Sequence, residues 1–228
     1  MTHNLTRQSG ILPSNRFIGK RVYLVGAGGI GSWTGLALSK MGISRLTIVD
    51  DDRVEAENVS SQAYMERNIG SLKVEALHET LHLFSPETRV TIVSHKFTGQ
   101  PAPSGIVISA VDSMASRTAI WEAVKENAHR VEFYIEARMA IEFLWLFSFK
   151  PYDADQAAWY EKMLYPDSQV VPAPCTQRAI VYTAFTAASQ IARVVKLHLS
   201  DQFVPRQIKY DIANDILKVS KDASILLA

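Results

Sequence analysis

The sequence predicts an α/β fold in which helices cover both faces of an open, mostly parallel sheet. Short β-branched runs alternate with amphipathic helical segments from residue 21 to about residue 130, and the first run ends in a glycine-rich turn. From Val131 onward two longer apolar runs stand close together, as is typical of antiparallel strands. We therefore expect a Rossmann-like, doubly wound sheet, extended by antiparallel strands and a C-terminal hairpin.

Length and composition indicate a single globular domain spanning residues 1–228. The chain is 47% hydrophobic, which is enough to bury a core, and its net charge is only +1, which gives no reason to expect a nucleic-acid partner. The single cysteine, Cys175, excludes an internal disulfide and a zinc site of paired cysteines, and it fits a cytoplasmic setting. We expect no membrane association, because the most apolar stretch is interrupted by charges and the N-terminus lacks a signal sequence.

The first predicted unit is a strand, a helix and a second strand. Residues 21–28 form a β-branched run that ends in glycines. Residues 32–42 then carry apolar side chains at helical spacing and stop at Gly42. Residues 44–50 form a second buried strand, so that a βαβ unit is complete at Asp50.

The alternation continues through two more strands and two more helices. An amphipathic helix is expected over residues 71–85, ended by Pro86, and a third strand over residues 89–97. A fourth strand over residues 104–112 leads into a helix over residues 113–128. Four strands in such an order indicate a parallel sheet.

The second half of the chain departs from this alternation. We expect two antiparallel strands, a long polar connection with a short helix, a long helix and a hairpin, at residues 131–138, 141–149, 150–175, 176–199 and 206–220. The hairpin is expected to turn at Asn214 and Asp215. Long connections are often functional.

The glycine-rich turn is a candidate phosphate site. Gly26, Gly28 and Gly31 form G-x-G-x-x-G between a predicted strand and a predicted helix, which is the context that the motif requires. Glycines let backbone N–H groups approach a phosphate, and the helix N-terminus adds a positive dipole. The motif does not name the nucleotide, since a dehydrogenase would use the same loop with Asp50 on the ribose of NAD.

An acidic cluster changes this interpretation. Asp50, Asp51 and Asp52 stand together, and the polar, irregular residues 53–64 follow where a dehydrogenase would usually begin its next helix. Carboxylates beside a phosphate site repel a bare polyphosphate unless they bind ribose or a bridging cation. The cluster therefore favours a magnesium nucleotide over a dinucleotide.

Several ordered motifs resemble one family along nearly the whole chain. They are GAGGIGS with its doubled glycine, DDDRVEAENVSSQ, IGSLKVEAL, AVDSMASR and, near the N-terminus, LTRQSGIL. This set resembles the ThiF, MoeB and HesA adenylyltransferases, which are relatives of the ubiquitin-activating enzymes. The resemblance implies ATP and Mg²⁺ as cofactors and a homodimer as the working unit.

The resemblance also implies a role for each matching residue. Asp52 would hold the ribose, Asn58 and Lys73 the phosphates, and Asp112 the magnesium ion. Arg7 would reach the phosphates bound by the neighbouring subunit, and Cys175 could bond to the carrier protein. The expected nucleotide-binding set is Gly26, Gly28, Gly29, Gly31, Asp50, Asp52, Asn58, Gln62, Lys73 and Asp112.

The chemistry expected of these residues is simple. Transfer of AMP to a carboxylate needs no general base, because the carboxylate is already ionised, and catalysis reduces to alignment and charge neutralisation. We expect adenylation of the C-terminal carboxylate of a small ubiquitin-like or sulfur-carrier protein, with release of pyrophosphate. Residues 1–20 would form an N-terminal arm, 21–130 the nucleotide-binding half and 131–228 the carrier-binding half, with a crossover segment at 151–174.

Simpler roles remain open for some of these residues. Asp112 could be the N-cap of the next helix, and Arg117 could pair with Glu122 on its own helix. A terminal arginine such as Arg7 is usually solvated. A lone cysteine such as Cys175 is more often an inert small residue, although a position just before a helix favours its thiolate.

The chain also departs from the family pattern. Ser61 stands where the family usually has an arginine that contacts phosphate, and Arg67 or Arg138 could compensate. The zinc-binding cysteine pairs of many members are missing. Three alternatives therefore stay open: adenylation of a peptide or an RNA-linked carboxylate, an NAD-dependent oxidoreductase, and a catalytically silent dimeric scaffold.

Overall fold

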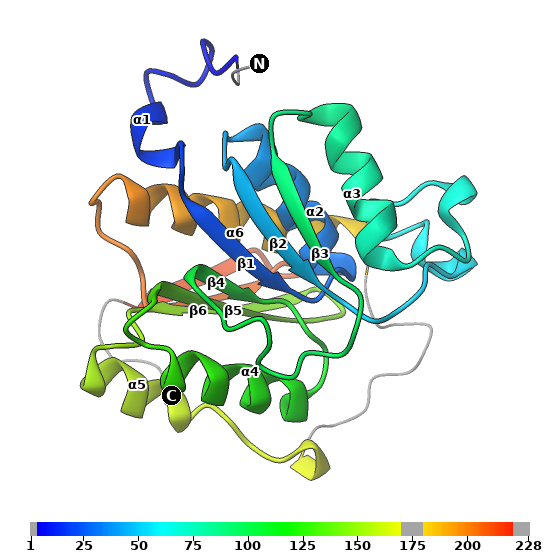
Figure 1. The fold of residues 1–228 in the computed structure, drawn as a ribbon. Coiled ribbons are helices and arrows are strands. Elements are labelled where there is room, and N and C mark those ends of the chain that lie inside the picture. Colours follow the sequence, from blue (N-terminus) through cyan, green and yellow to red (C-terminus); the bar gives the residue numbers. More distant parts are fainter. Residues whose placement is uncertain (1–3, 170–179, 221–228) are drawn as a thin grey trace.

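The strands of the protein form a single mixed sheet. The computed structural model describes residues 4–169 and 180–220, and within them eight strands lie in the order β3-β2-β1-β4-β5-β6-β7-β8 (Figure 1). The strands are β1 Arg21–Val25, β2 Arg45–Val49, β3 Arg89–Val93, β4 Gly105–Ser109, β5 Val131–Ala140, β6 Phe143–Phe149, β7 Gln207–Asp211 and β8 Ile216–Ser220.

Six α-helices and three short 3₁₀ helices accompany the sheet in the described residues. The α-helices are α1 Ser14–Phe17, α2 Gly29–Lys40, α3 Lys73–Phe84, α4 Met114–Glu126, α5 Ala154–Glu161 and α6 Val181–Leu199. The 3₁₀ helices are η1 Ala56–Asn58, η2 Glu66–Asn68 and η3 Asp167–Gln169. No helix in this part of the chain is long and apolar enough to cross a membrane.

Strand pairing changes direction once along the sheet. The strands β3, β2, β1, β4 and β5 pair in parallel, whereas β5, β6, β7 and β8 pair antiparallel. The expected parallel sheet with added antiparallel strands and a terminal hairpin is confirmed. Both predicted reversals are present, and each uses a residue with positive φ, namely Ile141 between β5 and β6 and Asp215 between β7 and β8.

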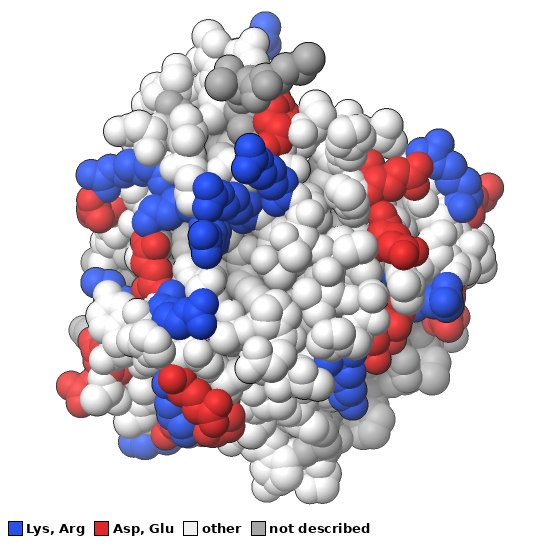
Figure 2. Space-filling model, in the orientation of Figure 1, with Lys and Arg blue, Asp and Glu red and all other residues white. Residues whose placement is uncertain are grey.

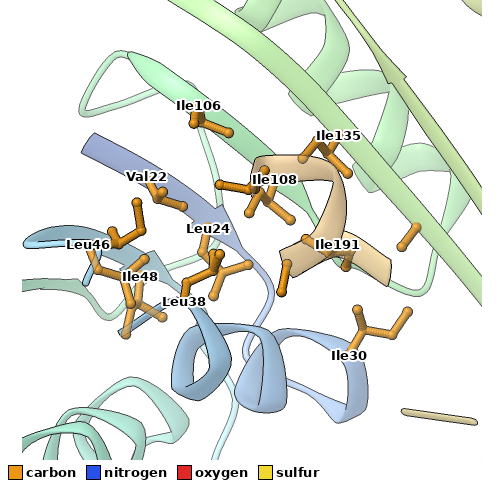
Figure 3. Packing of buried hydrophobic residues seen from close by; sticks show 14 of the residues in the cluster. Val22, Leu24, Ile30, Leu38, Leu46, Ile48, Ile106, Ile108, Ile135 and Ile191 are labelled. Carbon is orange, nitrogen blue, oxygen red and sulfur yellow. The ribbon is translucent and has the colours of Figure 1, made fainter. Parts of the chain in front are cut away.

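Two hydrophobic layers hold helices on opposite faces of the sheet. Alternate residues of β1 point to each face, so that Leu24 packs with Leu38 of α2 and Ile191 of α6, as Figure 3 shows. On the other face Val25 belongs to a layer with Trp121 of α4 and Tyr160 of α5. Helices α2, α3 and α6 therefore cover one face and α4 and α5 the other (Figure 1), which makes the sheet doubly wound.

The central strand β1 sets the position of the site. Its parallel neighbours are β2 on one side and β4 on the other, so that the connections from the two halves of the sheet diverge at the carboxyl end of β1. Gly26 follows β1 with φ +95°, and a Cβ there would lie 2.5 Å from the carbonyl oxygen of Ala110. A Cβ on Gly31 would lie 1.9 Å from the carbonyl oxygen of Gly26. Backbone contacts thus pack the glycine loop against β4 and α2.

The long connection after β6 contains the short helix that the sequence predicts. The Asp153 carboxylate begins α5 by accepting hydrogen bonds from the backbone N–H groups of Asp155 and Gln156, both at 3.1 Å. The last residues of the expected crossover segment, 170–174, lie outside the described residues.

Candidate active site

A cleft of about 710 Å³ opens at the carboxyl ends of β1, β2 and β4. This is the place where ligands bind in open α/β sheets, because the connections diverge there. Four segments that are far apart in the sequence meet around it: the glycine loop, the acidic segment, the start of α3 and the loop after β4. The expected site residues that line it are Gly26, Gly28, Gly29, Asp50, Asp52, Gln62, Lys73 and Asp112.

The first wall of the cleft is the start of α2. The N-cap position is Gly28, which offers no side chain to the first-turn N–H groups, and these groups have no intrahelical acceptors. A Cβ on Gly28 would have no atom of the described residues within 4 Å and would stand in the cleft. The loop therefore leaves both room and backbone donors for an anion.

Asp50 holds the glycine loop and the acidic segment together. Its carboxylate accepts hydrogen bonds from the backbone N–H groups of Ala27, at 2.6 Å, and Asp52, at 2.9 Å. Burial raises the pKa of Asp50, while these two hydrogen bonds oppose the rise. Asp50 lines the cleft, but its carboxylate is already used to shape the loop.

Asp52 and Lys73 form an ion pair across the cleft wall. The Lys73 ammonium lies 2.7 Å from the Asp52 carboxylate; the lysine side chain is 10% exposed and the aspartate side chain 65% exposed. The backbone N–H of Lys73 also donates to the Asp52 carbonyl at 2.9 Å. These contacts keep a largely buried cation at the edge of the cleft.

Asp112 follows β4 and presents an exposed carboxylate to the cleft. The idea that Asp112 is the N-cap of α4 is wrong, because the cap is Ser113, whose hydroxyl oxygen accepts from the N–H of Ser116 at 3.1 Å. The Asp112 side chain makes no hydrogen bond or ion pair within the described part of the chain. It is therefore free to bind a cation.

Arg117 supports the backbone that carries Asp112. The pairing with Glu122 is wrong: Glu122 pairs with Lys125 at 3.0 Å, whereas Arg117 lies 3.0 Å from the fully buried Glu136 of β5. The Arg117 guanidinium also donates to the carbonyl oxygens of Val111 and Asp112, the latter at 2.9 Å. Arg117 thereby ties the loop after β4 to β5.

The two arginines expected to compensate for Ser61 do not line the cleft. Arg67 pairs with Glu79 at 2.8 Å near the protein surface. Arg138 pairs with Glu136, lies over the rings of Trp145, Phe147 and Tyr165, and donates to the carbonyl of Met163 at 3.0 Å. Among the described residues, Lys96, just after β3, joins Lys73 and Arg117 in lining the cleft.

The remaining expected site residues lie elsewhere. Gly31 packs under the glycine loop, and the Asn58 side chain accepts from the N–H of Glu55 at 2.9 Å to close the η1 turn. Arg7 is exposed on the arm before α1. These three are absent from the described lining of the cleft. Cys175 lies outside the described residues.

Among the lining residues that the sequence analysis did not identify are Lys96, Phe97 and Met139. Lys96 and Phe97 come three and four positions after the end of β3 at Val93, so their place after a parallel strand is a usable signal. Met139 on the antiparallel strand β5 carries no such signal.

The residues present are chemically suited to a magnesium nucleotide. The exposed Asp112 carboxylate lines the cleft, and carboxylate oxygens of Asp50, Asp51 and Asp52 lie within 4.8 Å of one another; oxygen ligands are those that Mg²⁺ prefers. The side-chain oxygen of Gln62, a lining residue, is buried and has no hydrogen-bond partner in the described structure. A glycine loop at a helix N-terminus beside these groups, at the switch point of a doubly wound sheet, defines the class of Rossmann-type nucleotide-binding proteins.

Comparison with known proteins places the chain within that class. The ThiF family model matches residues 15–221, and the chain therefore belongs to the ThiF family. The resemblance noted in the sequence is thereby confirmed.

Individual relatives match parts of the chain. A tRNA threonylcarbamoyladenosine dehydratase from Escherichia coli (strain K12) is 32% identical over 118 residues, which are 49% of this chain and 44% of that protein. Ubiquitin-like modifier-activating enzyme 5 from Drosophila virilis is 31% identical over 140 residues, which are 54% of this chain and 35% of that protein. The match thus spans less than half the length of each relative.

Solved structures share the fold. E. coli MccB, in a crystal structure with ATP, is 18% identical with a TM-score of 0.71 and covers 91% of this chain and 65% of its own. PaaA is 16% identical with a TM-score of 0.74, over 95% of this chain and 68% of its own.

Proposed function

We propose that the protein is an ATP- and magnesium-dependent adenylyltransferase that activates the C-terminal carboxylate of a small ubiquitin-like or sulfur-carrier protein. One observation carries the proposal. The glycine loop, the Asp52–Lys73 pair and the unpaired Asp112 carboxylate all line a single cleft at the switch point of the sheet. Membership of the ThiF family and the crystal structure of MccB with ATP support it.

In this proposal each group of lining residues binds a different part of the magnesium nucleotide. The N–H groups at the start of α2 and the Lys73 ammonium bind phosphate oxygens, and Asp52 binds the ribose once Lys73 has turned to the phosphates. Asp112 holds Mg²⁺, which supplies charge neutralisation at the phosphates. Arg117 is a positioning residue that fixes the backbone of Asp112 through its bonds to the Val111 and Asp112 carbonyls.

The reaction needs alignment more than proton transfer. An oxygen of the substrate carboxylate forms a bond to the α-phosphorus of ATP, while the bond from that phosphorus to the bridging oxygen breaks and pyrophosphate leaves. The attacking carboxylate is already ionised, so that no general base is required. The resulting acyl adenylate would pass to a sulfur donor or a thiol, for which Cys175 is a candidate.

Further parts of the proposal concern assembly. Residues 1–20 serve as an arm, 21–130 as the nucleotide-binding half and 131–228 as the carrier-binding half, whose crossover segment 151–174 closes over the carrier tail. The protein acts as a homodimer, in which the exposed Arg7 reaches the partner subunit's phosphates.

A second substrate class is supported by the relatives. One is named for a tRNA nucleoside, and MccB has been solved with the partner MccA. Adenylation of an RNA-linked carboxylate or of a peptide is therefore the alternative to a ubiquitin-like carrier.

ATP–pyrophosphate exchange tests the proposal. The assay compares a carrier protein ending in Gly-Gly, a peptide and a carboxylate-bearing tRNA as substrates. We expect exchange with the carrier, with chelation of Mg²⁺ abolishing it and Asp112→Ala or Lys73→Ala lowering it at least about 100-fold, because charge stabilisation in the transition state is removed. Glu126→Ala is the matched control, since Glu126 is exposed at the opposite end of α4.

The outcomes separate the alternatives. Exchange that requires the peptide or the tRNA would keep adenylation and change the substrate. Exchange unchanged in both site variants would refute the site, and nucleotide binding without exchange for any substrate would indicate a silent scaffold.

A further inference from the structure

A second concave pocket, of about 420 Å³, lies at the opposite edge of the sheet from the candidate active site. It opens at the amino ends of β1, β2 and β3 and beside the start of β5. Its charged lining consists of four arginines and no carboxylate in the described structure: Arg21, Arg45, Arg89 and Arg130. Figure 2 shows a group of Lys and Arg side chains gathered on the face that carries these strand ends in Figure 1.

Strand register places three of these arginines side by side. Arg21 of β1 is the register partner of Arg45 of β2, and Arg45 is the register partner of Arg89 of β3. Neighbouring strands lie about 4.8 Å apart, and residues in register project from the same face. Like charges directly across a strand pair are destabilising. The row therefore costs stability unless an anion offsets the charge.

The fourth arginine continues this row on the other side of β1. Arg130 immediately precedes β5, and its carbonyl accepts from the N–H of Gly105, the first residue of β4, at 2.9 Å. Gly105 lets the start of β4 pack closely against Arg21, because a Cβ there would lie 2.5 Å from the carbonyl oxygen of Arg21.

All four arginines are exposed and unpaired. None makes an ion pair or a side-chain hydrogen bond within residues 4–169 and 180–220. Elsewhere in the protein arginines do find carboxylates, as the ion pairs of Arg16, Arg67, Arg117 and Arg138 show. The charge is therefore local, since the whole chain carries a net charge of only +1.

Hydroxyl groups form part of the pocket lining, and one wall of the pocket is held in place by a hydrogen bond. Thr47 and Thr91, register partners on β2 and β3, line it together with Ser104. The buried Tyr23 donates its hydroxyl proton to the carbonyl of Pro101 at 2.7 Å, which fixes the loop before β4 as one wall. Hydroxyl and guanidinium groups both donate hydrogen bonds, and phosphate oxygens accept them, so this combination of side chains suits a phosphate ligand.

We propose that this pocket binds a small ligand that carries two or more phosphate groups. Each guanidinium group can bind a phosphate through two parallel hydrogen bonds. Arginines on neighbouring strands can therefore bind adjacent phosphates of one ligand at the same time. The volume lies within the usual range for small-molecule sites. An RNA strand fits less well, because all four arginines line one pocket of about 420 Å³, whereas a nucleic-acid strand is bound along an extended groove.

Calorimetric titration with inorganic tripolyphosphate, in magnesium-free buffer, tests this site. We expect saturable binding to the wild type that is weakened at least about tenfold by the double substitution Arg45→Gln/Arg89→Gln. Arg193→Gln is the matched control, because it removes the charge of an exposed arginine on α6, away from the pocket. Lys73→Ala should leave this binding in place, which separates it from phosphate binding in the active-site cleft.

A second measurement guards against a folding defect. In the absence of ligand the double variant should melt no lower than the wild type, because it removes repulsion between neighbouring arginines. The proposal is overturned if tripolyphosphate does not bind, if the double variant binds it as tightly as the wild type, or if binding disappears in Lys73→Ala. Binding only of a single-stranded RNA, with no response to tripolyphosphate, would overturn it in favour of a nucleic-acid surface.

Discussion

Glycine occupies three positions of the glycine loop for different structural reasons. Gly26 has a positive φ and touches the backbone of Ala110, and Gly31 packs its Cα side against the carbonyl of Gly26. The fold itself requires both. Gly28 has φ −78° and open space where a Cβ would stand. No atom of the described residues would clash with a side chain there, so glycine at that position leaves room for the contents of the cleft.

Alanine substitutions should separate these reasons. Gly31→Ala forces the carbonyl of Gly26 to move and should lower the free energy of unfolding by roughly 1–3 kcal/mol or more. Gly28→Ala should change it by less than about 1 kcal/mol, a cap effect only, yet weaken MgATP binding roughly tenfold by obstructing a backbone hydrogen bond. Chemical denaturation and nucleotide titration of both variants measure the two effects. A Gly28→Ala protein that is strongly destabilised, or that binds MgATP normally, would contradict this assignment.

The limits of sequence reasoning are clearest at single side chains. Lys73 and Asp112 could be placed at the cleft because each stands where a predicted element begins or ends. The partner of Arg117 could not be predicted, because Glu136 is on a different strand and the nearer Glu122 pairs with Lys125. Helical spacing shows which residues are close along a helix, but it does not show which strand packs against that helix.

Among the elements, β5 connects the cleft to the second half of the chain. Glu136 of β5 pairs with Arg117 of α4 and Arg138 of β5, and it accepts a hydrogen bond from Tyr160 of α5. Burial, together with the nearby Tyr134 and Glu136, raises the pKa of Tyr160 well above its usual value. The network therefore joins the loop of Asp112 to α5, the short helix within the proposed crossover segment.

A second ionic cluster fastens β5 to the start of β1 and to α6. The Glu132 carboxylate lies 2.7 Å from the Lys20 ammonium and 3.0 Å from Nε2 of His198. The hydrogen bond with His198, followed by that with Lys20, lowers the pKa of Glu132 to about 2 from an ordinary value of 4.5. Because the pKa is lowered by folding, this cluster stabilises the protein above pH 4.5 and loses its effect as the pH falls toward 2.

Glu132→Gln should therefore reduce the loss of stability in acid. Between pH 5 and pH 2 the free energy of unfolding of the wild type should fall more steeply than that of the variant, by about 1 kcal/mol or less because the pair is partly exposed to solvent. Denaturant titrations at a series of pH values measure the slopes. Glu126→Gln, at an exposed carboxylate on α4, should keep the wild-type slope. Equal slopes in all three proteins would show that Glu132 does not contribute.

Most of the element order was predictable, because strand and helix periodicities are local properties. The change from alternating elements to adjacent apolar runs at Val131 correctly indicated the antiparallel strands β5 and β6. The lateral order of the strands was not predictable in the same way. It depends on which faces pack together, and the sequence alone does not state that β1 lies between β2 and β4.

At the scale of the whole molecule, the two edges of the parallel sheet carry different charges. The cleft at the carboxyl edge combines aspartates with Lys73 and Lys96, whereas the pocket at the amino edge is lined by four arginines and, among the described residues, by no carboxylate. The net charge of +1 conceals this arrangement, because a sum over the chain contains no positions. Arginines that are far apart in the sequence lie side by side because their strands pair in register. This arrangement can be recognised only once the strand pairing is known.

The central claim is that the cleft at the carboxyl edge holds a magnesium nucleotide through its own charged groups. Equilibrium binding of MgATP and of NAD tests it most directly, measured in the Arg45→Gln/Arg89→Gln background so that the arginine pocket cannot contribute. We predict saturable binding of MgATP, weakened at least about tenfold by Lys73→Ala, and no comparable binding of NAD. Tighter binding of NAD than of MgATP, or an affinity for MgATP that Lys73→Ala leaves unchanged, would contradict the account.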